Sequence, residues 1–444
     1  MQTRLTMAAL AFLTALGGVG SAATIKPLAL GNGPSAEPGY VHRRFEKPAI
    51  SDAVGQRVAV FARTKGRRCI FTFDPDTADP DTAAGSAVVA CWGDLTPLPP
   101  PQFVFRRFGV KFGDVSINLS SRVGWASEVF DAGRGVFQSN PLEWVARTGD
   151  AAPGTAGVLD QMSFGRNDDT GGVAFVTTVS GDPVVTQGVF RCSGGNGKCS
   201  PQQPPATGVL TAIALVGDAV PDRAGRKFCE FIDMDSSIYG TAFRAATKVD
   251  CADAGETPLD GVFLKPLGVL PIRTLALIGE PAAPNLLPVS TYWRLYGRPS
   301  IANTGIVAFG GTTQGEFRKR TLFLCDPTVC PTSPAIAAVQ EGQGVITGPV
   351  AASFHVFSAP GVSDVGDIAF TASLIRPGRG YGAFIRRTNG TFTNVGVSGD
   401  PVPNLSQPAS WVQFLLPSMS PGGKMTFVAR IRAQKKVYGV FAYE

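Results

Sequence analysis

The chain has 444 residues, of which 44% are hydrophobic and 17% charged, with 40 lysines and arginines against 34 aspartates and glutamates. Basic residues occur in short, scattered runs such as Lys65-Gly-Arg-Arg68 and Lys435-Lys436, which argues for a solvated surface and against nucleic-acid binding, since that needs a concentrated basic patch. The 53 glycines and 35 prolines, with few helix-forming runs, indicate many turns and short strands.

Residues 1–23 have the pattern of a signal peptide. Arg4 is the only charged residue before an apolar run from Met7 to Val19, and the small residues Ser21-Ala-Ala23 follow, with cleavage expected near Ala23. This run is too short to cross about 30 Å of hydrocarbon, and no later stretch reaches about 18 apolar residues. We therefore expect a secreted or periplasmic protein without a membrane span once the signal is removed.

A phrase recurs seven times in the rest of the chain: Pro-x-Ile, a small or Asx residue, two further residues, Gly, and a β-branched pair that ends in Ala-Phe. The copy from Pro299 to Phe309 is the cleanest. A period of about 60 residues separates the positions that end the phrase, as in repeat architectures: Val60, Trp125, Phe175, Phe243, Phe309, Phe370 and Phe427. A Gly-Val-Phe strand and an alternating strand that closes on Gly-Asp follow each copy, so a unit holds four short strands.

The first two strands of each unit join in a predicted tight turn. A small, Asn or Asp residue three positions before the glycine can bond to its own backbone, while the glycine supplies a positive φ; these residues are Asn118, Asp168, Ser236, Ala302, Ser363 and Ser420. Ser121 and Tyr239 replace the glycine in two units. Prolines recur in the first strand (Pro48, Pro299, Pro360 and Pro417) and cannot donate to a ladder. We therefore expect the first strand to be innermost, beside an axial channel.

The two ends of the chain complete each other. The seventh unit stops at Phe441-Ala-Tyr-Glu444, after its third strand, and Pro27 to Gly33 reads like the fourth strand of another unit, Ile213 to Asp218. We predict an all-β fold, a seven-bladed β-propeller of four-stranded antiparallel blades whose ring is closed by the N-terminal strand. The single domain, 24–444, would divide into blades at about 39–97, 98–155, 156–222, 223–284, 285–345, 346–404, and 405–444 with 24–38.

Eight cysteines fall in twos within single units, which predicts short-range disulfides: Cys69/Cys91, Cys192/Cys199, Cys229/Cys251 and Cys325/Cys330. Eight cysteines allow about 105 pairings, and pairing within a unit is the simplest. A zinc site would need Cys-x-x-Cys or histidine companions, and the sequence has neither.

These marks resemble the secreted bacterial tandem-repeat proteins named for their Asn-x-x-Gly-x-x-Ala-Phe repeat. The matching copies are Asp168 to Phe175, Ala302 to Phe309 and Ser363 to Phe370, although none of the three begins with Asn. The resemblance covers nearly the whole mature chain and implies an exported repeat protein without an established activity. Such proteins often carry a surface anchor, and we expect none here, because no hydrophobic tail follows the last strand.

Few residues form a recognisable catalytic pattern. The only histidines, His42 and His355, fall in the first and sixth units, so a surface or turn role is expected rather than catalysis. Acidic residues close the fourth strands once per unit and would be spread around the ring as turn residues: Asp150, Asp218, Glu280 and Asp400. A local acidic cluster, Asp74, Asp76, Asp79 and Asp81, could wrap a calcium ion, or it could be an extended acidic loop. No other cofactor is expected.

The leading hypothesis is a monomeric, secreted, non-enzymatic propeller that presents loops for binding a protein or a polysaccharide. One alternative is a propeller hydrolase or lyase with its active site in the axial funnel, where several charged side chains would converge. Another is a structural component of an envelope or matrix.

Overall fold

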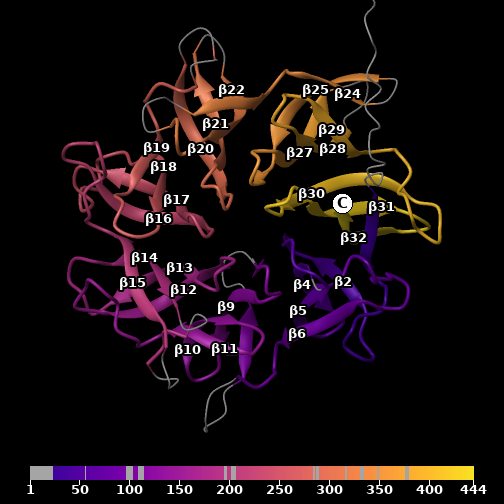
Figure 1. Cartoon of the computed structure of the whole chain (residues 1–444), viewed down its shortest axis with the longest axis horizontal. Helices are drawn as coiled ribbons and strands as arrows, with labels where there is room; N and C mark the ends of the chain where they lie inside the picture. The colour runs from indigo at the N-terminus through magenta and orange to yellow at the C-terminus, as the bar shows by residue number, and fades with distance from the viewer. Residues whose placement is uncertain are drawn as a thin grey trace, which may run out of the picture.

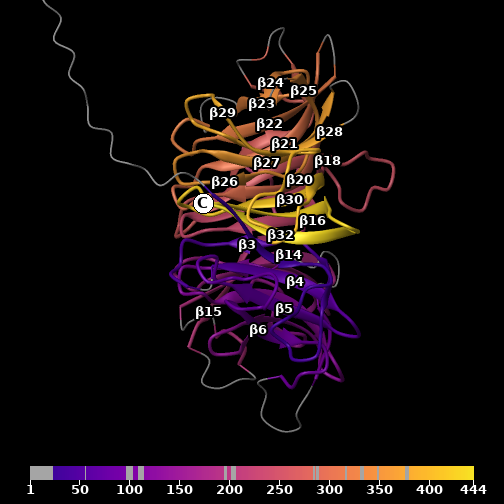
Figure 2. The same cartoon turned by 90° about the vertical axis from the view of Figure 1, so that its right-hand side faces the viewer.

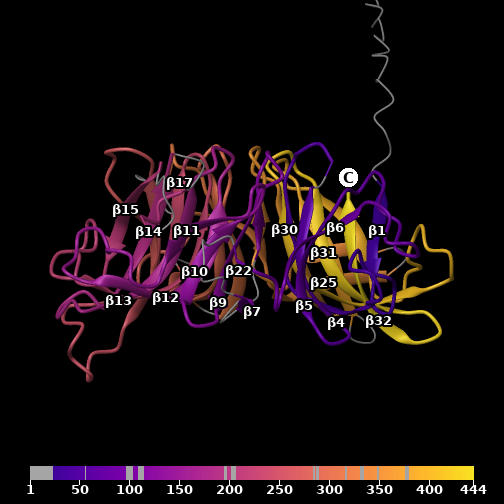
Figure 3. The same ribbon diagram turned by 90° about the horizontal axis from the view of Figure 1, so that it is seen from below.

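The computed structural model describes residues 24–55, 57–96, 104–108, 115–194, 198–201, 207–283, 286, 290–315, 318–330, 335–347, 350–375 and 380–444. The expected signal peptide lies outside these residues. Within them every regular element is a β-strand, and the strands form seven antiparallel sheets arranged around an axis (Figure 1). The predicted seven-bladed β-propeller is confirmed. Seen edge-on, the ring is a disc with two faces (Figures 2 and 3).

The first four blades follow one another around the ring in chain order. Blade 1 holds β2 (His42–Phe45), β3 (Ala49–Ile50), β4 (Val58–Thr64), β5 (Arg68–Phe73) and β6 (Ser86–Cys91). Blade 2 holds β7 (Phe105–Phe108), β8 (Ser116–Ile117), β9 (Val123–Val129), β10 (Gly133–Gln138) and β11 (Glu143–Arg147). Blade 3 holds β12 (Val158–Asn167), β13 (Val173–Ser180), β14 (Gln187–Ser193) and β15 (Val209–Leu215). Blade 4 holds β16 (Lys227–Ser236), β17 (Gly240–Lys248), β18 (Leu259–Pro266) and β19 (Arg273–Leu277).

The last three blades complete the ring. Blade 5 holds β20 (Thr291–Ile301), β21 (Val307–Gln314), β22 (Lys319–Cys325) and β23 (Ile336–Gln340). Blade 6 holds β25 (Val350–Phe357), β26 (Gly361–Val362), β27 (Ile368–Ile375), β28 (Gly380–Arg386) and β29 (Phe392–Val397), and β24 (Gly344–Thr347) extends it beyond β25. Blade 7 holds β30 (Ser410–Met419), β31 (Met425–Arg432), β32 (Lys436–Tyr443) and β1 (Ile25–Leu30). In this part of the chain no helix is long and apolar enough to cross a membrane.

The repeated aromatic residues form the core of every blade. The residue that ends the Ala-Phe phrase lies directly opposite the phenylalanine of the Gly-Val-Phe strand in each blade, from Val60 opposite Phe71 to Phe427 opposite Phe441. In blade 5 the rings of Phe309 and Phe323 stack with centroids 5.3 Å apart. Such cross-strand aromatic pairs stabilise a sheet beyond the area that they bury. The repeat in the sequence is therefore a repeat of inter-strand packing.

The ring closes as the two chain ends predict. β1 pairs antiparallel with β32, from Ile25 opposite Tyr443 to Leu30 opposite Gly439. The amide of Thr24 donates to the carbonyl of Glu444 at 2.8 Å, and the amide of Glu444 donates back at 3.1 Å. The first ordered strand thus supplies the fourth strand of the last blade, which removes an exposed sheet edge.

The turn between the first two strands follows the predicted chemistry, with one correction. Gly171, Gly305, Gly366 and Gly423 have φ between 82° and 89°, and Ser121 takes the same left-handed conformation at 56° without being glycine. In blade 4 the turn begins at Ser237 rather than Ser236, because the amide of Ser237 bonds to the carbonyl of Gly240. The prediction of Ser236 was wrong by one residue because this turn is one residue shorter than the others.

All four predicted cysteine pairs are disulfides in the structure: Cys69–Cys91, Cys192–Cys199, Cys229–Cys251 and Cys325–Cys330. Each joins parts of a single blade. Four disulfides are typical of a protein that folds in an oxidising compartment.

Candidate functional site

The innermost strands line an axial channel, as the prolines predict. The residue two positions before each inner turn faces this channel, and it is small in five blades: Ala49, Ser116, Ser300, Gly361 and Ser418. The cavity has a volume of about 100 Å³. Ligand pockets usually measure about 300–1,000 Å³, so the channel has room for water or a small ion but not for a sugar residue.

Blades 3 and 4 place charged residues at the equivalent channel-facing positions. Arg166 and Asp235 form an ion pair with Nε and Oδ1 3.9 Å apart. Asp235 also accepts a hydrogen bond from the amide of Ile301 at 3.3 Å, and Nη1 of Arg166 donates to the carbonyl of Val115 at 2.5 Å. Burial raises the pKa of Asp235, although the charges of Arg166 and Lys47 oppose the rise. These contacts join neighbouring blades across the channel.

Carboxylates at one mouth of the channel also join blades. Asp169 accepts hydrogen bonds from the amide of Leu119 at 2.9 Å and from Nδ2 of Asn303 at 2.7 Å. Asp364 accepts from the amide of Asn303 at 2.7 Å, and Asp52 accepts from the hydroxyl of Ser420 at 2.7 Å. Each of these acids therefore binds the inner turn of another blade, and the contacts stabilise the ring.

The two histidines lie far from each other. His42 is buried among Phe45, Phe71 and Phe73, with ring centroids 4.8–6.4 Å away, and burial lowers its pKa to about 4. A surface or turn position was the wrong expectation for His42, because its ring fills the apolar interior of blade 1. His355 is exposed, and its Nδ1 lies 2.6 Å from the carboxylate of Glu341.

The acidic loop proposed for calcium is organised by its own hydrogen bonds. Asp74 accepts from the amide of Asp76 at 3.0 Å, and Asp79 accepts from the amide of Asp81 at 2.9 Å, so the loop contains two successive Asx turns. Asp76 forms ion pairs with Lys26 and Arg57, both at 2.9 Å. Calcium binding by Asp74, Asp76, Asp79 and Asp81 remains a prediction, and the loop geometry has an explanation without it.

The acids that close the outer strands are turn residues. Oδ2 of Asp150 accepts the amide of Arg147 at 2.9 Å, and Oδ2 of Asp218 accepts the amide of Leu215 at 2.8 Å. The amides of Glu280 and Asp400 close the same turn on the carbonyls three residues before them. The sequence interpretation as turn residues is confirmed.

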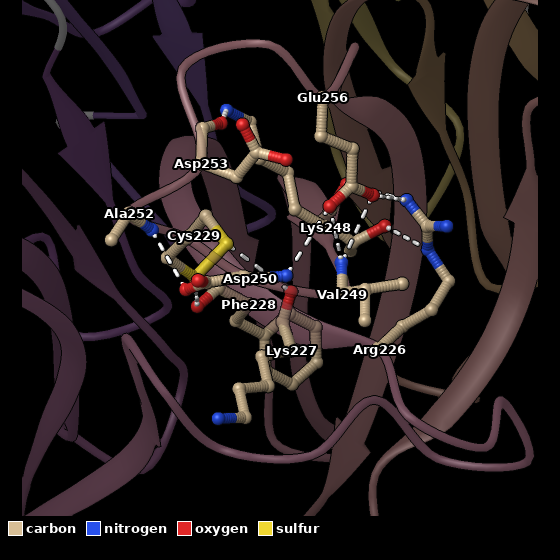
Figure 4. Close-up of a disulfide and its surroundings, with 12 residues drawn as sticks. Arg226, Lys227, Phe228, Cys229, Lys248, Val249, Asp250, Ala252, Asp253 and Glu256 are labelled. Carbon is tan, nitrogen blue, oxygen red and sulfur yellow. Dashed lines mark hydrogen bonds and ion pairs between the residues drawn. A yellow bond between two sulfur atoms is a disulfide. The ribbon is translucent and has the colours of Figure 1, made fainter.

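A long loop of blade 4 is held by the disulfide Cys229–Cys251 and by a dense set of hydrogen bonds around it (Figure 4). The carboxylate of Glu256 accepts from the amide of Val249 at 2.9 and 3.0 Å and pairs with Arg226 at 3.4 Å. The partners of Glu256 thus lie within the loop and immediately before β16. The residues that line the axial channel include none from this loop.

A basic pocket lies between blades 1 and 2. Its volume is about 470 Å³, within the range of ligand sites. We define the arginine pocket by its lining residues: Arg43, Arg63, Thr64, Gly66, Arg67, Arg68, Trp92, Arg106 and Glu128. It brings together five arginines, one carboxylate and Trp92, a residue that is 47% exposed. Arg67 and Arg68 of the basic run Lys65-Gly-Arg-Arg68 are therefore part of a concentrated patch, contrary to the sequence interpretation.

Blade 1 fixes the position of the tryptophan through Arg67. The guanidinium of Arg67 donates to the carbonyl of Trp92 from Nε at 3.0 Å and from Nη2 at 2.8 Å. It also forms ion pairs with Glu37 and Asp94. The disulfide Cys69–Cys91 joins the residues adjacent to Arg68 and Trp92, so it sets the distance between the third and fourth strands at the pocket wall.

The remaining arginines leave a surplus of positive charge. Arg63 and Arg68 lie directly opposite each other across the β4–β5 ladder, and like charges in that position destabilise a sheet. Among the residues that the structure describes, no carboxylate lies within 4.0 Å of Arg43, Arg63 or Arg68. The exposed Arg106 contacts Glu128 only at 3.6 Å. The pocket is thus electrostatically suited to an anion.

A family model matches residues 117–441, and its description is a family of unknown function, DUF7453. The chain belongs to this family. A search of curated proteins found no match. Solved structures with a similar outline include an oligogalacturonate lyase in complex with manganese (11% identity, 95% of this chain and 97% of the other, TM-score 0.46) and a Penicillium chrysogenum α-L-arabinanase complexed with arabinobiose (12%, 95% and 98%, TM-score 0.33). A protein of unknown function from Dyadobacter fermentans is also similar (10%, 95% and 99%, TM-score 0.33).

At these values the similarities say nothing about the activity of this DUF7453 protein, and the fold assignment rests on its sheet topology. The arginine pocket was not predicted from the sequence, because its residues come from five separate segments. One signal was available: residues 63 and 68 flank the predicted turn between the second and third strands, where their side chains would share a face.

Proposed function

We propose that this protein is an exported, non-enzymatic propeller that binds a glycan chain in the arginine pocket. The observation that carries the proposal is the pairing of a ligand-sized cavity with the exposed Trp92, whose backbone is held by Arg67 and by the disulfide at Cys91. An exposed aromatic ring on a fixed backbone offers a flat apolar surface to a sugar ring. Export is supported by the four disulfides and by the signal-peptide pattern of residues 1–23. We also propose that the chain is related to the Asn-x-x-Gly-x-x-Ala-Phe repeat proteins.

Binding is favoured over hydrolysis by the composition of the two cavities. Glycoside hydrolysis uses two carboxyl groups about 5–10 Å apart on either side of the bond. The arginine pocket is lined by one carboxylate, Glu128, which faces Arg106. The axial channel has Asp235, but a volume of about 100 Å³ gives a sugar no room beside it. An enzyme acting in the axial funnel is therefore the weaker alternative.

Trp92→Ala tests the proposal, with Trp293→Ala as the matched control. Trp293 is 40% exposed, lies on blade 5 and is covered by the guanidinium of Arg318 at 3.8 Å. Microarray and calorimetric binding to a panel of neutral and acidic polysaccharides should weaken by about tenfold or more in Trp92→Ala, as expected for an aromatic side chain that the ligand covers. Trp293→Ala should bind as the wild type does. Equal binding by both variants, or no binding of any polysaccharide by the wild type, would refute a glycan site at Trp92.

A further inference from the structure

We infer that the glycan bound in the arginine pocket is acidic and that Arg63 and Arg68 recognise its uronate carboxylates. This inference rests on the proposed function and adds the chemical class of the ligand. Its first support is the charge of the pocket. Of five arginines, Arg67 is neutralised by Glu37 and Asp94, and Arg106 faces Glu128, whereas Arg43, Arg63 and Arg68 have no carboxylate partner among the described residues.

The second support is the backbone geometry. Arg63 and Arg68 project from the same face of adjacent strands, because opposite residues in an antiparallel pair lie side by side. Phe61 and Ile70, the next residues on that face, are buried in the core that blade 1 shares with blade 2. The two guanidinium groups therefore extend from the blade 1–blade 2 interface. An anion between the two groups would remove the repulsion between them.

The donor type favours an oxyanion. A guanidinium presents two parallel N–H groups that match a carboxylate or a phosphate, and it is less strongly hydrated than an ammonium. The pocket contains arginines and no lysine. Uronate residues along a polysaccharide carry one carboxylate per sugar, so a chain can contact Trp92 with one ring face and the arginines with its carboxylates.

A nucleic acid fits these residues less well. Sites for single strands combine a long positive groove with several aromatic platforms, one for each base. Here one exposed tryptophan stands in a compact pocket. The disulfides also indicate an oxidising compartment.

The test compares alginate oligosaccharides, neutral dextran, dextran sulfate and a single-stranded DNA oligonucleotide by calorimetry with the full mature chain. We expect alginate to bind and dextran to bind at least about tenfold more weakly, with alginate affinity falling as salt rises from 50 to 500 mM because the ion pairs are exposed. Arg63→Gln with Arg68→Gln should reduce alginate affinity by about tenfold or more, since two charge-assisted contacts are lost.

The matched control is Arg432→Gln with Lys436→Gln. These residues are opposite each other across β31 and β32, beside the corresponding turn of blade 7, so the control removes the same charge from the same kind of site. It should leave alginate binding unchanged. If dextran binds as well as alginate, and Trp92→Ala weakens both while the arginine variants do not, the proposed glycan site stands and the acidic ligand is refuted. Stronger binding of dextran sulfate or DNA than of alginate would refute the uronate assignment, and equal loss in both double variants would refute the role of Arg63 and Arg68.

Discussion

At the scale of single residues, the structure separates side chains that stabilise the blades from side chains that are available to a ligand. The acids predicted from the sequence to be turn residues, such as Asp150 and Asp218, accept backbone amides of their own turns. Local patterns of this kind could be predicted because a turn is determined by a few adjacent residues. The arginine pocket could not, since Arg43 and Arg63 of blade 1 become neighbours of Arg106 only when blades 1 and 2 pack together.

His42 gives the fold a sensitivity to acid. Burial lowers its pKa from 6.5 to about 4, so between these two pH values the imidazole is protonated in the unfolded chain and neutral in the folded chain. Stability is therefore lost as the pH falls from 6.5 toward 4. Between pH 7 and pH 5 the loss from this residue should be about 2 kcal/mol. We expect His42→Phe to reduce the decrease in unfolding free energy over this range by that amount, measured by urea denaturation at each pH. An unchanged slope in His42→Phe would contradict the assignment.

At the scale of elements, the repeat predicts which strands pair and which residues form the core. The Ala-Phe and Gly-Val-Phe strands were recognisable because each blade needs the same aromatic pair, for example Phe243 opposite Phe263. Details that depend on one blade were not predictable. The inner strand is interrupted in blades 1 and 6, β24 extends blade 6, and the blade 4 turn is shorter by one residue. These differences leave the pairing of the core residues unchanged.

Disulfide Cys69–Cys91 should matter for binding as well as for stability. Cys69 and Cys91 are 22 residues apart, as are Cys229 and Cys251, so loop-closure entropy assigns the two bonds similar contributions of about 3 kcal/mol. We expect Cys69→Ser with Cys91→Ser to weaken alginate binding, because Arg68 and Trp92 lose the covalent link between their strands. Cys229→Ser with Cys251→Ser should lose similar stability in urea denaturation and keep wild-type affinity. If both double variants bind equally well under conditions where both are folded, the disulfide does not position the pocket.

At the scale of the whole molecule, the fold depends on a strand that comes from the other end of the chain. β1 buries Leu28 and Ala29 in the core that blades 7 and 1 share, and Lys26 pairs with Glu444 at 2.9 Å. Arg57 of blade 1 contacts the same glutamate at 3.0 Å, so the closing strand, the C-terminal residue and the first blade form one charged cluster. The split last blade was predictable because a closed ring of seven four-stranded sheets leaves no other place for the strand 25–30.

Deleting residues 24–33 should therefore destabilise the entire ring and not only its last blade. The deletion removes the buried Leu28 and a ladder of backbone hydrogen bonds, a loss of at least about 5 kcal/mol, and it exposes the edge of β32 to aggregation. A circular permutant distinguishes this loss from a mere shortening of the chain. Since Thr24 and Glu444 are hydrogen-bonded to each other, a short glycine linker can join them, and the new chain can begin at the exposed Gly39. We expect the permutant to unfold in urea at nearly the wild-type midpoint, whereas the deletion variant should unfold far earlier or precipitate. A deletion variant as stable as the wild type would show that β1 does not close the ring, and an unstable permutant would show that closure needs the segment at the N-terminus.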